Sequence, residues 1–114
     1  MAKITFNIEF TMCASSLIAG ADYEDDIRYT VSNDWEDIIK DQMEDIDDTN
    51  LLDFLKSLDG DQIMKALTYD EDDGEKDYYD TDPDDGDTIF LITLPVTLNT
   101  ALIGYPEGED YNLI

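Results

Sequence analysis

The side chains that could do chemistry in this sequence are almost all carboxylates. Of 114 residues, 30 are Asp or Glu, against 6 Lys or Arg, a single cysteine (Cys13) and no histidine. Without histidine, Ser-His-Asp and Cys-His catalysis are excluded. A nuclease centre could be drawn from Asp70, Glu75 and Lys76, but so acidic a chain would repel its polyanionic substrate. The glycines match no phosphate-binding loop. We therefore predict a protein that is not an enzyme and needs no cofactor.

Two acidic stretches, DEDDGE and DPDDGD, offer the oxygen ligands that calcium prefers. An EF-hand loop requires an acid or amide at its first position, glycine at the sixth and glutamate at the twelfth. With Gly74 in the sixth place, the first is Tyr69 and the twelfth is Asp80. With Gly86 there, the corresponding residues are Thr81 and Ile92. Both registers fail, so we predict only weak divalent-ion binding and no specific metal site.

The net charge of −24 limits the class of partner. Nucleic acid and anionic lipid are disfavoured as ligands, because a surface must supply cations to neutralise phosphates. A basic protein surface is favoured. The start MAKITFNIEF resembles no signal peptide, and no apolar run is long enough to span a membrane. Together with the lone cysteine, these features predict a protein of the reducing cytoplasm, with no membrane partner.

The elements that would position the acids can be read from hydrophobic spacing. Apolar residues alternate with polar ones from Lys3 to Met12, which predicts a strand with one buried face. The run TIFLITLPVTLN predicts a strand covered on both faces, with Pro95 at an edge, bulge or break. The remaining predicted elements are a loop over 13–26, a short strand over 26–31, a helix over 34–46 capped by Asn33, a second helix capped by Asp48, a third capped by Asp59 with Gln62, an acidic insertion or loop over 69–87, and a turn-rich tail over 104–114.

These elements predict one α+β domain spanning residues 1–114. We expect a small antiparallel sheet of three or four strands, with two or three helices packed on one face.

The predicted helix over 34–46 has an apolar face and an acidic face. Trp35, Ile38, Ile39, Met43 and Ile46 share one arc at helical spacing. Ordinary solvated helix faces mix Lys and Arg among their acids, yet Lys40 is the only base here. We therefore predict that the opposite face binds a partner through Asp34, Asp37, Asp41, Glu44, Asp45 and Asp48.

The stretch from Tyr69 to Asp87 is the most acidic part of the sequence, with 9 Asp, 2 Glu and one Lys in 19 residues. One interpretation is a disordered tract that only aids solubility. The aromatic residues within it argue against that reading, because solvating tracts are poor in aromatics. The residues predicted here to bind a partner are Asp70, Glu71, Asp72, Asp73, Asp77, Tyr78, Tyr79, Asp80, Asp82, Asp84, Asp85 and Asp87.

The amount and type of charge suggest what the partner recognises. Duplex DNA carries one charge per about 1.7 Å of axis, so −24 equals the phosphates of about 12 base pairs. The excess of 22 Asp over 8 Glu holds the carboxylates close to the backbone. In its size, acidity, Asp-rich helix face and aromatics among the acids, the chain resembles phage-encoded DNA-mimic proteins, the anti-restriction and anti-CRISPR inhibitors. The resemblance is one of composition. It implies an inhibitor that occupies the DNA-binding groove of a host nuclease, restriction enzyme or CRISPR effector.

Two alternatives remain. Halophilic proteins are also acidic, although 12 Ile against 2 Val, 6 Ala and 1 Arg is unlike the usage we expect of a halophile with a GC-rich genome. An acidic adaptor or chaperone could instead bind a basic nucleoid or transcription protein without imitating DNA. Competition with DNA separates this alternative from mimicry.

Overall fold

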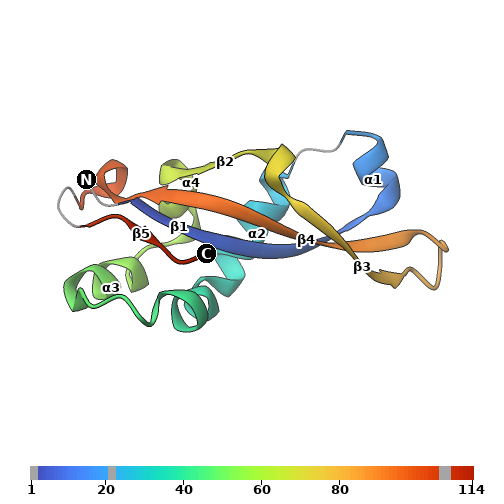
Figure 1. Ribbon diagram of the computed structural model, residues 1–114. Helices are drawn as coiled ribbons and strands as arrows, with labels where there is room; N and C mark the ends of the chain where they lie inside the picture. The colour runs from blue at the N-terminus through green and yellow to red at the C-terminus, as the bar shows by residue number, and fades with distance from the viewer. Residues whose placement is uncertain (1–2, 21–22, 106–108) are drawn as a thin grey trace.

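The computed structural model describes residues 3–20, 23–105 and 109–114, and Figure 1 shows its course. Residues 21–22 of the predicted loop and 106–108 of the predicted tail lie outside the described part. The strands are β1 (Lys3–Cys13), β2 (Leu67–Tyr69), β3 (Glu75–Thr81), β4 (Thr88–Asn99) and β5 (Tyr111–Asn112). The helices are α1 (Ala14–Ile18), α2 (Glu24–Ile38), the π-helical segment η1 (Ile39–Met43), α3 (Thr49–Lys56), α4 (Gly60–Ala66), and the 3₁₀ turns η2 (Glu71–Asp73) and η3 (Thr100–Ile103).

The long strands β1 and β4 pair antiparallel along their whole length and form the centre of the sheet. On the outer edge of β4, β2 pairs with one half of the strand and β3 with the other. At the opposite edge of the sheet, β5 pairs with β1 in parallel at Ile4 and Thr5. The α+β class is confirmed. In the described residues the sheet is mixed and has five strands, not the three or four antiparallel strands predicted.

The core lies between the sheet and the helices. Alternate residues of β1, from Ile4 to Met12, are buried as predicted, and so are Ile92, Leu94, Val96 and Leu98 of β4. All five apolar residues predicted for the buried helix face are also buried. The Trp35 Nε1 donates a hydrogen bond to the Leu55 carbonyl at 2.7 Å, which joins α2 to α3. The opposite face of β4 is only half-buried, so the prediction that both faces are covered was wrong.

Pro95 lies where the partner of β4 changes. β2 pairs with β4 up to Val96, and β3 begins to pair with it at Thr93. The proline therefore lies between the two short edge strands, where no ladder donor is required. Of the three predicted alternatives, the local edge is confirmed, whereas β4 runs unbroken through Pro95 and is not divided into two shorter strands.

The predicted strand over 26–31 is helical and belongs to α2. Ile27, Val31 and Trp35 are spaced four apart and buried, while Tyr29 is 71% exposed. The spacing of Ile27 and Val31 also fits one face of a β-strand, and this ambiguity produced the wrong prediction. The helix thus begins ten residues before Asp34, with Glu24, Asp25 and Asp26 in the first turn, where acids suit the helix dipole. Asn33 is no N-cap, because its side-chain amide donates to the Tyr29 carbonyl within the helix.

The predictions for the next two helix starts are confirmed. The Asp48 carboxylate accepts from the Leu51 amide at 3.1 Å and caps α3. Asp59 accepts from the Gln62 amide at 2.8 Å, and the Gln62 side chain accepts from the Asp59 amide at 3.0 Å. This reciprocal capping box starts α4. The helix ends at Ala66, and Leu67 begins β2.

The predicted acidic insertion or loop over 69–87 contains β3, which forms a β-hairpin with β4. Tyr69 ends β2, η2 follows, and β3 then pairs with β4 from Glu75 to Thr81. A loop was predicted because aspartate has a low β-strand propensity, and this prediction was wrong. Tyr78, Tyr79 and Thr81 have a high β-strand propensity, and β4 supplies the partner strand. The tail, predicted only as turns, contributes β5.

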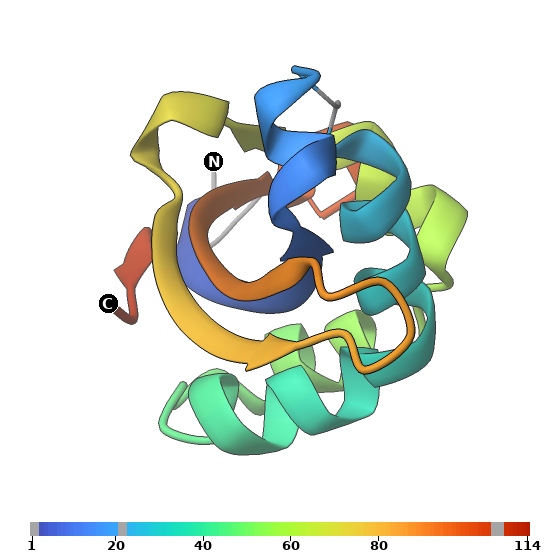
Figure 2. The same ribbon diagram turned by 90° about the vertical axis from the view of Figure 1, so that its right-hand side faces the viewer.

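The molecule is elongated. Its principal extents are 48 × 23 × 22 Å and its radius of gyration is 15.3 Å, against about 13 Å for a compact domain of this length. Figure 2, which looks along the rod, shows β1 and β4 curling together with α2 beside them.

Candidate protein-binding surfaces

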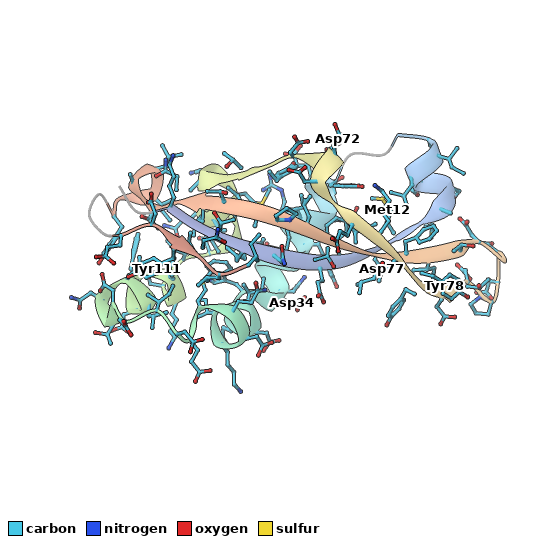
Figure 3. The ribbon with its side chains drawn as sticks, viewed as in Figure 1. Met12, Asp34, Asp72, Asp77, Tyr78 and Tyr111 are labelled. Atoms are coloured by element: carbon cyan, nitrogen blue, oxygen red, sulfur yellow. The ribbon has the colours of Figure 1, made fainter. Side chains whose placement is uncertain are left out.

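Three of the predicted acids of α2 and η1 lie along a groove beside β1. Asp34, Asp37 and Asp41 line a hollow of about 520 Å³, and its opposite wall is formed by β1 at Asn7 and Glu9. A second hollow of about 510 Å³ shares Glu9 and Asp34 with the first. We call the two together the edge groove. Figure 3 labels Asp34 on the side of the helix next to the sheet.

The second hollow extends the edge groove toward the start of α2. It is lined by Asp26 and Tyr29 from the helix, Thr11 from β1, and Tyr79 with Leu91 from the β3–β4 hairpin. Sequence reasoning missed Asp26, Tyr29 and Glu9 as site residues. Asp26 and Tyr29 were assigned to a strand, and only the pairing of elements distant in sequence places Glu9 opposite them.

The remaining predicted acids of the helix face lie elsewhere. Glu44 joins Glu36, Lys40 and Lys56 around a different hollow of about 510 Å³, which Asp37 also borders. Asp45 is exposed beyond the end of η1. The six acids therefore do not form one row on a single helix, because the helix ends as a π-helical segment at Met43.

Asp48 is engaged within the fold. One of its oxygens caps α3, and the other accepts a hydrogen bond from the Tyr105 hydroxyl at 3.2 Å. A structural role accounts for this residue.

The β3–β4 hairpin presents acids and aromatics on an exposed strand. All seven residues of β3 are exposed, including Tyr78 at 68% and Tyr79 at 60%. The register shifts between Tyr78 and Asp80, so Tyr79 lies in a bulge. Figure 3 shows Asp77 and Tyr78 near the end of the rod that carries the hairpin turn.

Several acids around this hairpin shape turns. Asp70 accepts from the Asp72 amide at 3.0 Å and Asp82 from the Asp84 amide at 2.9 Å. Asp80 accepts from the Thr81 amide at 2.7 Å. The Asp87 carboxylate accepts from the Ser15 hydroxyl, which joins the hairpin to α1.

The other predicted acids near β3 are exposed. The Glu71 side chain accepts from the Tyr23 amide at 3.5 Å. The exposed aspartates are Asp72, Asp73, Asp84 and Asp85.

Ion pairs within the described part of the chain neutralise few of its acidic side chains. Among the described residues the ion pairs are those of Arg28, with Glu24 at 3.7 Å and Asp61 at 3.0 Å. Burial, and next the charge of Asp25, raise the pKa of Asp26 in the edge groove above its ordinary value. The groove is thus a place where an uncompensated carboxylate is partly removed from water.

The described residues contain no group of three or more His, Cys, Asp or Glu side chains arranged to hold a metal ion. None of the helices in the described ranges is long and apolar enough to cross a membrane.

In comparisons with known proteins, no family model, curated protein or solved structure matches this chain.

Proposed function

We propose that this chain is a DNA-mimic inhibitor, which occupies the DNA-binding groove of a basic host protein. The observation that carries the proposal is the charge per length of the rod. A net charge of −24 over 48 Å is one charge per about 2 Å. Duplex DNA has one per about 1.7 Å of axis. A basic groove that binds a DNA duplex by releasing its counterions would therefore meet a similar number of negative charges along the same length of this protein.

The arrangement of the acids supports this proposal. Carboxylates stand on α2 and η1 along one part of the rod and on the β3–β4 hairpin toward one end. They carry their charge on a folded scaffold, so binding orders less of the backbone than it would in a flexible tail. We propose a nuclease, restriction enzyme or CRISPR effector as the target, with the protein acting in the host cytoplasm as a phage counter-defence factor.

The exposed tyrosines favour a second candidate function. Tyr78 and Tyr79 have no counterpart in the phosphate rows of a duplex, and exposed tyrosines are enriched where proteins bind each other. An acidic adaptor or chaperone for a basic nucleoid or transcription protein would use them without imitating DNA.

Competition with DNA tests the proposal. The tagged protein is used to capture partners from bacterial lysate, which are eluted by salt and purified. The complex is then titrated with a short duplex. A DNA mimic and the duplex exclude each other, and the mimic's affinity falls steeply with salt. Simultaneous binding, with the affinity for the duplex unchanged, would reject mimicry and leave the adaptor.

A further inference from the structure

One edge of β1 is open beyond Asn7. Residues of a strand point their backbone groups alternately to the two sides. The Thr5 carbonyl accepts from the Leu113 amide on the β5 side at 2.9 Å, so the odd residues of β1 face away from β4. Beyond Asn7, the next odd residues are Glu9 and Thr11, and both are exposed. Within residues 3–20, 23–105 and 109–114, no strand pairs with this edge beyond Thr5.

The same edge is closed at Asn7 by a side chain that takes the place of a strand. Gln42 of η1 accepts from the Asn7 amide at 3.1 Å and donates to the Asn7 carbonyl at 2.6 Å. The open part therefore runs from Glu9 toward the end of β1 at Cys13. It offers the amides and carbonyls of Glu9 and Thr11 as a ladder for a short extended segment.

The open edge lies inside the edge groove. Glu9 lines both of its hollows and Thr11 lines the second, while α2 and η1 supply Asp26, Asp34, Asp37 and Asp41 along the facing wall. None of these four acids is among the ion pairs found in the described residues. A segment added to the edge would meet carboxylates on one side and the aromatic rings of Tyr29 and Tyr79 at the end nearer Thr11.

We propose that the edge groove binds an extended, basic segment of a partner protein, which adds to the free edge of β1 as a further strand. The backbone of Glu9 and Thr11 supplies the hydrogen bonds, and Lys or Arg at alternate positions pairs with the acids of α2 and η1. A second copy of this chain is a poor occupant, because each copy brings 24 net negative charges and the same acidic wall. The proposal goes beyond DNA mimicry, since a duplex surface has no strand edge to offer.

A synthetic peptide tests the proposal directly. The probe is an octapeptide of alternating Lys and Val, blocked at both ends, titrated into the full chain at moderate salt. We expect binding with a Kd below about 1 mM. N-methylation of alternate residues removes the donors on one edge of the peptide only, so two isomers form a matched pair. One isomer should lose at least about tenfold in affinity and the other should not. Equal affinity of both isomers, or no binding at that concentration, would overturn the proposal.

A variant pair in the protein provides the second readout. Thr11→Pro removes a donor from the open edge and leaves the ladder with β4 intact, whereas Thr11→Val retains the donor. We expect the peptide to protect the backbone amides at positions 9 and 11 from hydrogen exchange in the Val variant and to bind the Pro variant at least about tenfold more weakly. If the Pro variant does not fold, the exchange measurement on the unaltered chain decides the question. Lack of protection at both amides when the peptide is bound would show a purely electrostatic contact.

Discussion

Folding partly removes the Asp26 carboxylate from water and places it beside Asp25. The pKa of Asp26 is raised, so the native state prefers the protonated carboxyl more than the unfolded state does. Ionisation of Asp26 therefore lowers stability. Below the ordinary pKa of an aspartate, Asp26 is protonated in both states and the loss of stability is absent. Above the raised pKa of the folded state, Asp26 is ionised in both states and the loss is complete.

We expect Asp26→Asn to increase the free energy of unfolding at neutral pH. It should also reduce the decline in stability as the pH rises from about 4 to 7, near the ordinary pKa of Asp. Urea denaturation at both pH values measures the effect. Asp34→Asn is the control, because it removes the same charge from an exposed position of the same helix. An equal gain from the two variants would mean that general repulsion, and not the burial of Asp26, is responsible.

Local chemistry made some residues predictable. The capping box of Asp59 and Gln62 needs only residues three apart, so the sequence is sufficient to find it. Glu9 shows the opposite case. Its alternation on a strand was predicted, but its place in the edge groove depends on α2, which lies far along the chain.

At the scale of elements, segments with a clear apolar pattern, such as β1 and β4, were predicted as strands, whereas segments with an ambiguous or acidic pattern were not. β1 alternates over eleven residues, and both the strand and its buried face were found. The start of α2 satisfies two periods, and β3 owes its conformation to pairing with β4 rather than to its own acidic sequence. β5 has two residues and is defined by its partner. Tertiary pairing thus decided the elements that the sequence alone left open.

The β1–α2 contact provides a stability prediction. Phe6 is fully buried, and its ring lies 5.9 Å from that of Trp35. We expect Phe6→Ala to lower the free energy of unfolding by about 3–5 kcal/mol. Thr11→Ala on the opposite face of the same strand should change it by less than about 0.5 kcal/mol. Chemical denaturation measures both, and a small effect of the Phe6 variant would contradict the packing of α2 on β1.

Two groups of acids can be compared as binding elements. The helix group is Asp37, Asp41, Glu44 and Asp45, and the hairpin group is Asp77, Asp80, Asp82 and Asp84. We expect each group, changed together to Asn or Gln, to weaken target binding more than any single change within it, since one rim charge contributes little. The amides keep the acceptor oxygens that the turns use.

Equal charge removal elsewhere is the control for both groups. Asp47, Asp53, Asp61 and Glu109 are exposed and belong to neither group. Their neutralisation should reduce affinity less than that of either group, as measured by titration calorimetry with the captured partner. A hairpin variant with unchanged affinity would assign β3 to solubility alone.

At the scale of the whole molecule, negative charge dominates. With 30 acids and 6 bases, the folded chain is opposed by its own repulsion. Raising NaCl from 0.01 to 0.5 M shortens the screening length from about 30 Å to less than about 10 Å. We therefore expect the urea midpoint to rise with NaCl. The rise should be smaller in a variant that combines the helix and hairpin changes, and a midpoint independent of salt would contradict dominant self-repulsion.

The central ladder has a consequence for how the chain acquires its structure. Lys3 pairs with Asn99 and Cys13 with Ile89, so the two long strands come from opposite ends of the sequence. Contacts of such separation close slowly, because a long loop must be ordered before they form. During synthesis, β1 leaves the ribosome long before β4, so the apolar face of β1 stays unpaired with β4 in the interval. The acidic residues that emerge in the interval carry like charge on every nascent copy, which keeps neighbouring chains apart until the ladder can close.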